Sequence, residues 1–419
     1  MTAKRFLFNL LFLFIVAIIS GVTFLMINAV SQNSQKKKGV SRIVYQTPIF
    51  YVFFSFLFFV FFAFVFVFCY RACKKKKRSE EQDDILNLPR LPNRFSFKEL
   101  KIATENFGHK IGQGGFGSVF EGKLADDTKV AVKRLEDGII GQRRKEFLAE
   151  VETIGNLHHI NVVRLIGFCA EKSNRLLVFE FMENGSLDKW IFGRTPDTVL
   201  DWQTKVKIII DIAKGLSYLH EECRQRIAHL DIKPQNILLD KNFNAKVADF
   251  GLAKLIDRDQ RELNTRMRGT IGYLAPEWLT SAITEKVDVF SFGIVVMEIV
   301  CGRKNFEHSQ PEDGARLISL LQEKVNIDRL LDMVDRNEID IQLHGEKAVE
   351  MMRLAMWCLQ TNSCKRPSMS TVVKVLEGNL SMETDLDYNF FTSATLNAND
   401  HIYIAISSDI NNSHLSGPR

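Results

Sequence analysis

A run of 22 residues without a single charge, from Ile49 to Tyr70, constrains this chain more than any other feature. As an α-helix rising about 1.5 Å per residue, the run is long enough to cross a hydrocarbon core about 30 Å thick. Eleven of the 33 phenylalanines fall between Phe50 and Phe68. A buried helix in a globular core is the alternative, and the length and apolarity of the run argue against it. We therefore predict a transmembrane helix over residues 49–70.

A second apolar run, residues 6–30, follows Lys4 and Arg5. This pattern fits either a retained first transmembrane helix, acting as a signal anchor, or a cleaved secretory signal peptide within residues 1–30. The run exceeds the roughly 7–15 apolar residues usual in a signal peptide. The sequence therefore favours the retained helix and leaves the signal peptide open.

Six cations follow the second run directly, in residues 71–78. The positive-inside rule places everything after them in the cytosol. Only residues 31–48 then lie outside, as a loop too short to be a folded ectodomain. We expect a membrane location, in the plasma membrane, with residues 71–78 in contact with anionic lipids.

The charge distribution excludes a nucleic-acid binder. Residues 1–78 carry twelve Lys or Arg and no Asp or Glu, so the formal net charge of +5 divides into +12 there and −7 in the rest. A nucleic-acid binder would carry its basic excess on the folded domain. The seven cysteines lack the spacing of a zinc site or disulfide framework, which fits a reducing compartment for the larger part.

The soluble part is divided by its local patterns. Residues 71–104 form a basic juxtamembrane segment and linker, residues 105–380 a packed domain, and residues 381–419 an Asn-, Ser- and Thr-rich tail expected to be disordered. Strand-like runs come first and helical periodicity later, which predicts an α+β fold with two lobes. The predicted strands cover residues 110–121, 128–134, 162–169 and 175–181, and the predicted helices residues 202–222, 286–301 and 345–360.

A glycine-rich loop lies within the first strand-like run, residues 110–121. Gly112, Gly114 and Gly117 form a G-x-G-x-x-G-x-V pattern, in which glycines allow backbone to approach phosphates. A dinucleotide-binding turn has a similar glycine pattern, but a helix follows it. Here Val119 and the run Val130–Lys133 predict strand after the glycines, so the loop joins two strands. Lys133 needs a partner inside an apolar strand. Glu150 is the best candidate because it borders the apolar stripe Phe147, Val151 and Ile154.

Further polar residues lie between apolar neighbours in His229–Asp240. Phosphoryl transfer needs a carboxylate to orient the attacking hydroxyl and a metal ligand nearby. Asp231 fits the first role and Asn236 the second. Asp249-Phe250-Gly251 and, later, Ala275-Pro276-Glu277 follow in order.

Together these motifs resemble a eukaryotic protein kinase domain. Residues 94–107 and 177–187 are similar to plant receptor-like kinases. The run His229-Leu230-Asp231-Ile232-Lys233-Pro234-Gln235-Asn236 resembles the S-domain (G-type lectin) group. The resemblance implies a bilobal kinase fold, with a small β-rich N-lobe holding one key helix and a larger helical C-lobe. It also implies ATP and Mg²⁺ (or Mn²⁺) as cofactors and protein substrates as partners.

The resemblance assigns roles by position. It implies that the glycine loop covers the ATP phosphates and that Lys133, paired with Glu150, holds them. It implies Asp231 as catalytic base, Lys233 as a phosphate contact, and Asn236 and Asp249 as metal ligands. Phe179 would be the gatekeeper, with Glu180 and Met182 binding adenine through their backbones. Lys233 and Thr270 resemble Ser/Thr rather than Tyr kinases, and Glu277 is expected to pair with Arg366. The implied nucleotide-contacting set is Ile111, Gly112, Gly114, Gly117, Val119, Ala131, Lys133, Phe179, Glu180 and Met182.

Two departures from the family pattern shape the functional prediction. Leu230 replaces the Arg of H-R-D, which binds a phosphorylated activation loop, so little dependence on phosphorylation of Thr265 or Thr270 is expected. The lectin ectodomain has no counterpart, so the chain would associate with another receptor or be a shortened product. We predict a membrane-anchored Ser/Thr kinase; the alternative is a membrane-bound, pseudokinase-like scaffold. His158, His159 and His220 are interpreted as structural.

Overall fold

The computed structural model divides the chain into two units, Met1–Asn87 and Leu88–Arg419. It describes residues 57, 59–71, 92–114, 117–135, 147–148, 150–171, 174–193, 199–256, 269–279, 283–305, 317–334 and 343–383. The predictions for residues 1–48, for much of the 49–70 span, for residues 72–91, for Thr265 and for the tail beyond residue 383 therefore concern residues outside this set.

In the first unit, residue 57 and residues 59–71 are helical. Large apolar side chains are exposed along this helix, among them Phe59, Phe61, Phe64 and Phe68. Among the described residues, no helix combines the length and the apolarity needed to cross a membrane.

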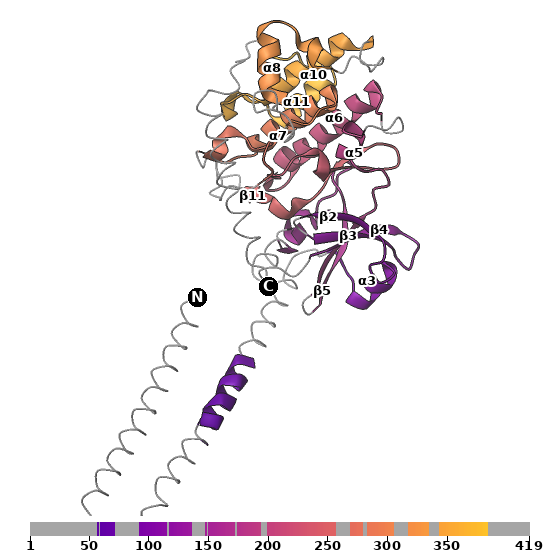
Figure 1. Cartoon of the computed structure of the whole chain (residues 1–419), viewed down its shortest axis with the longest axis vertical. Coiled ribbons are helices and arrows are strands. Elements are labelled where there is room, and N and C mark those ends of the chain that lie inside the picture. Colours follow the sequence, from indigo (N-terminus) through magenta and orange to yellow (C-terminus); the bar gives the residue numbers. More distant parts are fainter. Residues whose placement is uncertain are drawn as a thin grey trace, which may run out of the picture. The chain divides into compact units, whose positions relative to one another are not determined.

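The second unit begins with a six-stranded sheet, the lower part of the folded body in Figure 1. The strand order is β1-β5-β6-β4-β3-β2, and every neighbouring pair is antiparallel except β1 with β5. The strands are β1 (Asn93–Arg94), β2 (Lys110–Gly114), β3 (Gly117–Lys123), β4 (Lys129–Arg134), β5 (Leu165–Glu171) and β6 (Asn174–Glu180).

Helix α3 (Phe97–Ala103) covers one face of this sheet. Ser96 caps its first turn, because its hydroxyl accepts from the backbone N–H of Glu99 while the Glu99 carboxylate accepts from the N–H of Ser96. Leu100 is fully buried in a cluster with alternate residues of the strands, including Val130, Val132 and Val178. Because successive side chains of a strand point to opposite faces of the sheet, Val130 and Val132 face α3, whereas Ala131 and Lys133 face the other side.

A short helix at residues 147–154 carries Glu150. Its apolar residues Phe147, Val151 and Ile154 are buried, and the Phe147 ring meets Phe168 of β5 edge-on at 6.0 Å between centroids. Glu150 is 1% exposed whereas Glu152 is exposed, as the apolar stripe predicted.

The remainder of the unit is mainly helical. Helix α7 (Lys286–Cys301) is buried at every residue after the first, because other helices surround it (Figure 1). Asp201 caps α6 by accepting from the N–H of Thr204. The helices are α5 (Asp188–Ile191), α6 (Trp202–Ser217), α7, α8 (Leu317–Asn326), α10 (Gly345–Cys358) and α11 (Met369–Leu376), and a π-turn, Tyr218–Glu222, extends α6.

Five short strands form two small sheets near the junction of the sheet and helical regions. One sheet has the order β10-β9-β7 and the other pairs β11 with β8. Their bounds are β7 (Gly185–Ser186), β8 (Arg226–Ala228), β9 (Ile237–Leu239), β10 (Ala245–Val247) and β11 (Lys254–Ile256), and short 3-10 turns cover Pro234–Asn236, Phe250–Leu252, Pro276–Leu279, Leu330–Met333 and Ser363–Lys365.

The structure differs from the sequence prediction at some boundaries. The run 110–121 holds two strands joined at the glycine loop. The strand predicted from residue 162 begins at Leu165, because Val162 and Val163 instead pair with Val247 of β10. Residues 92–104, assigned from sequence to the linker, form β1 and α3 and pack on the sheet.

Candidate active site

The glycine loop lies at the end of the β2–β3 hairpin. Gly112 pairs with Val119, and Gly114 pairs with Gly117. Gly117 has φ +130°, and a Cβ there would lie 2.2 Å from the carbonyl oxygen of Arg134. Only glycine fits this conformation and this close approach. Among the other predicted nucleotide contacts, Val119 is opposite Lys133 and Ala131 is opposite Phe179.

Lys133 is a buried cation held by two carboxylates. Its Nζ lies 3.1 Å from both oxygens of Glu150 and 2.8 Å from Oδ1 of Asp249. Burial alone would lower the pKa of Lys133, but the charges of Asp249 and Glu150 outweigh it and raise the pKa. Burial likewise acts to raise the pKa of Asp249, and Lys133 reverses this and lowers it. Lys133 and Asp249 therefore stay ionised, and the predicted Lys133–Glu150 contact is present.

Asp231 is the centre of a second polar cluster. Its Oδ2 accepts from Lys233 Nζ at 2.8 Å and from Asn236 Nδ2 at 3.0 Å, and its Oδ1 accepts from the Thr270 hydroxyl at 2.6 Å. Lys233 Nζ also donates to the Thr270 oxygen at 2.6 Å. Lys233, Asn236 and Thr270, all singled out from sequence, thus lie within hydrogen-bonding distance of the Asp231 carboxylate.

The catalytic-loop backbone is held by Asp288, which the sequence analysis missed. This carboxylate, 0% exposed on α7, accepts from the backbone N–H of His229 at 2.7 Å and from that of Leu230 at 2.8 Å. The His220 Nε2 lies 2.9 Å from the same carboxylate. Leu230 is buried with φ +67°. An Asp within an otherwise apolar helix was the signal available in the sequence.

His229 links this loop to Asp249-Phe250-Gly251. Its Nε2 lies 2.9 Å from the carbonyl oxygen of Ala248, and its Nδ1 accepts from the N–H of Asp231. These partners assign the neutral tautomer with the proton on Nε2. The ring meets Phe250 edge-on at 4.9 Å.

The two predicted metal ligands lie on adjoining segments, since the N–H of Ala248, next to Asp249, donates to the carbonyl of Asn236 at 2.8 Å. The Asn236 amide nitrogen donates to Asp231, so the side-chain oxygen of Asn236 is the atom that can face a cation. An amide oxygen and a carboxylate are ligands that Mg²⁺ accepts. Among the residues that the structure describes, no group of three or more His, Cys, Asp or Glu could hold a metal ion.

The predicted adenine-binding segment connects the sheet to the helical region. Phe179 lies opposite both Ala131 and Leu165. The Glu180 carboxylate accepts from the Arg164 N–H at 2.7 Å and from Lys246 Nζ at 2.8 Å. Met182 is 8% exposed. The Glu180 side chain is thus occupied, and its backbone N–H donates to the carbonyl of Arg164 at 3.1 Å.

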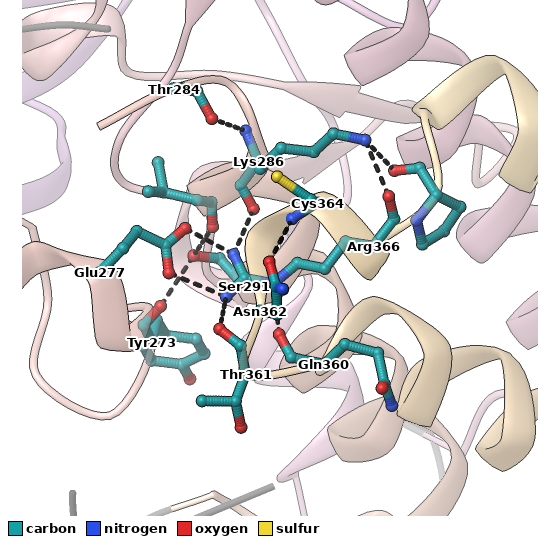
Figure 2. A network of polar contacts seen from close by, with 12 residues as sticks. Tyr273, Glu277, Thr284, Lys286, Ser291, Gln360, Thr361, Asn362, Cys364 and Arg366 are labelled. Carbon is teal, nitrogen blue, oxygen red and sulfur yellow. Dashed lines mark hydrogen bonds and ion pairs between the residues drawn. The ribbon is translucent and has the colours of Figure 1, made fainter. Parts of the chain in front are cut away.

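Glu277 and Arg366, expected to pair, form a bidentate ion pair of 2.6 and 2.8 Å (Figure 2). Arg366 is 2% exposed and also donates to the carbonyls of Lys286 and Gln360, at 2.9 and 2.7 Å. Lys286 Nζ donates to the carbonyls of Arg366 and Pro367. The network fixes the end of the segment that carries Thr270 to the start of α7.

Tyr273 provides a second anchor for this segment, also missed from sequence. Its hydroxyl lies 3.0 and 2.9 Å from the two oxygens of Glu298, and its carbonyl accepts from the Ser291 hydroxyl at 2.8 Å. Burial raises the pKa of Glu298 to about 7. The N–H of Asn305 donates to the same carboxylate, and its side-chain amide donates to the carbonyl of Gly272.

Residues 106–376 match the protein kinase domain. The chain belongs to the protein kinase family. It is 50% identical over 319 residues to the G-type lectin S-receptor-like serine/threonine-protein kinase SD2-5 of Arabidopsis thaliana, covering 74% of this chain and 39% of that protein. It is 40% identical over 330 residues to the G-type lectin S-receptor-like serine/threonine-protein kinase LECRK3 of Oryza sativa subsp. indica, covering 78% and 40%.

A probable receptor-like protein kinase of Arabidopsis thaliana is 40% identical over 326 residues, covering 74% of this chain and 72% of that relative. The chain spans about two fifths of the length of the two lectin-type kinases. The predicted kinase domain and its similarity to the G-type lectin group are confirmed for the kinase part.

Replacing Arg366 with Ala is expected to destabilise the kinase domain by about 3–5 kcal/mol, because Glu277 would remain buried without its partner. Arg329→Ala is the matched control, since Arg329 is 60% exposed and pairs with Asp332 at 2.6 Å. Exposed pairs contribute about 0–1 kcal/mol. Urea unfolding followed by tryptophan fluorescence measures both, and equal losses would contradict the prediction.

Proposed function

We propose that this chain is a membrane-anchored Ser/Thr protein kinase that transfers the γ-phosphate of ATP to Ser or Thr hydroxyls of protein substrates. The observation that carries the proposal is the cluster of Lys233, Thr270 and Asn236 around the Asp231 carboxylate. Lys133, Glu150 and Asp249 supply a separate charged cluster in the same domain. Together they provide the positioned base, the cationic group and the oxygen ligands that phosphoryl transfer requires.

Each side chain has a role in this proposal. Lys133 would hold the α- and β-phosphates, kept charged and oriented by Glu150. Asn236 and Asp249 would hold Mg²⁺ or Mn²⁺, which when bound neutralises charge on the phosphates. The Asp231 carboxylate would orient the substrate hydroxyl and accept its proton. Lys233 would contact the phosphate being transferred.

The adenine would bind between the glycine loop and the segment after β6. Phe179 would act as gatekeeper, and the backbones of Glu180 and Met182 would bind the ring. Support comes from the register that places Ala131 opposite Phe179 and Val119 opposite Lys133, so that these residues share one face of the sheet. Gly112, Gly114 and Gly117 would let the hairpin backbone approach the phosphates.

The preference for Ser or Thr rests on Thr270. Its hydroxyl bonds Asp231 Oδ1 while Lys233 bonds Asp231 Oδ2, so both flank the proposed base on the side of the activation segment. The names of the relatives describe them as serine/threonine-protein kinases. The proposed protein substrates follow from this chemistry.

The membrane anchor is proposed from the sequence of residues 49–70 and from the exposed phenylalanines of residues 59–68. The six cations of residues 71–78 would contact anionic lipids of the cytosolic leaflet, with the kinase domain in the cytosol. We propose a plasma-membrane location, and a co-receptor as partner because residues 31–48 are short.

Lys133→Met is expected to lower autophosphorylation by at least about a hundredfold, because the cation facing the phosphates is lost. The test uses the full chain with ATP and Mg²⁺ and counts incorporated phosphate. Lys129→Met is the control, since Lys129 lies on the same strand with its side chain 60% exposed. Equal absence of phosphate in wild type and Lys133→Met would instead favour a scaffold without catalysis.

We also propose that activity does not require a phosphorylated activation loop. Leu230 carries no charge to bind a phosphate, and Asp288 fixes the loop backbone from the buried helix α7. Thr265→Ala should therefore retain activity within about threefold of wild type, whereas Asp231→Asn should remove it. If initial phosphorylation rates fell equally in both variants, the idea would be wrong.

Protease treatment of sealed vesicles holding the full chain, tagged at the N-terminus, tests the proposed topology. Cleavage within residues 31–48 from the outside, with the kinase domain protected, is expected because the cations of residues 71–78 favour the cytosolic side. Cleavage of the kinase domain from the outside would contradict the proposal.

A further inference from the structure

The segment Pro92–Phe95, called the edge segment below, passes around one edge of the six-stranded sheet. Its residues Asn93 and Arg94 form β1, which pairs in parallel with Gly167 and Phe168 of β5. The N–H of Phe95 donates to the carbonyl of Phe168 at 2.9 Å. Helix α3 follows directly and covers one face of the sheet, so the segment joins that face to the sheet edge.

The sheet accommodates the edge segment through a glycine. A Cβ on Gly167 would lie 2.3 Å from the carbonyl oxygen of Asn93, 2.5 Å from Cε2 of Phe95 and 2.9 Å from Cδ2 of Phe95. The φ of Gly167 is not in the left-handed region, so the backbone conformation would allow a larger residue. It is the close approach of Asn93 and Phe95 that excludes a side chain at this position. A substitution there acts directly on the edge segment.

The other end of the segment reaches the helix that carries Glu150. A Cβ on Gly155, directly after the helix at 147–154, would lie 3.3 Å from Cδ of Pro92. Phe147, in the same helix, packs edge-on against Phe168, whose carbonyl accepts from the N–H of Phe95. Gly155 therefore lies beside the edge segment, and Phe147 lies against the strand residue that is bonded to it.

Most helical stability in proteins comes from packing of an apolar face, so the position of this helix depends on its buried residues Phe147, Val151 and Ile154. Glu150, 1% exposed, must remain about 3.1 Å from Lys133 to keep the buried pair together. A shift of about 1 Å in a positioned group can cost about a hundredfold in rate.

We propose that the edge segment is a positioning element for Glu150: Pro92, beside Gly155, and the backbone of Phe95, bonded to Phe168, hold the helical residues around Glu150 against β5 and so maintain the Lys133–Glu150 pair. The effect of this positioning on phosphate transfer rests on the proposed kinase function. The matched kinase region begins at residue 106. The segment before it is thus a working part of the phosphate-binding site as well as a connection to residues 71–91.

The test compares full-chain variants. Gly167→Ala displaces the edge segment from the sheet side, and the double variant Pro92→Gly with Phe95→Ala removes its contacts directly. Phe97→Ala is the matched control, because Phe97 packs beside the same α3 core cluster as Phe95, but its ring contacts Phe107 at 5.9 Å whereas the Phe95 ring lies beside Gly167. Hydrogen exchange of residues 147–155 without nucleotide is the first readout, and kcat and KM for ATP are the second.

The proposal expects exchange in residues 147–155 to be about tenfold faster in both edge variants. It expects kcat to fall about tenfold or more, with the thermal midpoint no lower than that of Phe97→Ala. Unchanged exchange in both edge variants would overturn it, as would an equal increase in Phe97→Ala. If the wild type showed no phosphotransfer, the kinase proposal would fail, and the exchange data alone would still decide the positioning role.

Discussion

The buried carboxylate of Asp288 organises the catalytic part of this molecule. It lies on the fully packed helix α7 and accepts from the N–H groups of His229 and Leu230. A buried charge is costly unless hydrogen bonds surround it, and here the loop backbone and His220 supply them. Satisfying this carboxylate fixes the backbone just before Asp231. The buried helix α7 thereby holds this polar loop in place.

Charge balance governs the other half of the site. Lys133 is shared between Glu150, from a short helix, and Asp249, from the segment after β10. In this arrangement the cation links the sheet to the metal-ligand region, and the pKa directions of Lys133 and Asp249 favour the charged forms. The same Lys133 charge would face phosphate oxygens when ATP is bound. The internal ion pairs thus keep the site charged and oriented before a ligand arrives.

The sequence predicted the residue types of the site but only some of its contacts. Lys133 with Glu150, and Glu277 with Arg366, were anticipated from motifs. Asp288 and Glu298 of α7, and Tyr273 of the segment before it, were missed because the sequence does not reveal which distant groups their polar atoms meet. The two-residue strand β1 is too short to show a period of two, so residues 92–104 were assigned to a linker. The Ser96–Glu99 capping box was readable in that stretch and marks the helix that packs there.

The sequence by itself determined the order of the kinase motifs, the alternation that gives the strands two faces, and the uncharged run followed by cations near the N-terminus. These depend on the nature of each residue and of its near neighbours. Only the tertiary structure decided which charges neutralise one another, such as Lys133 and Asp249, 116 positions apart. It also decided that an edge segment reaches the helix of Glu150. The cost of burying a charge follows from the residue type, whereas its compensation depends on distances between residues far apart in the chain.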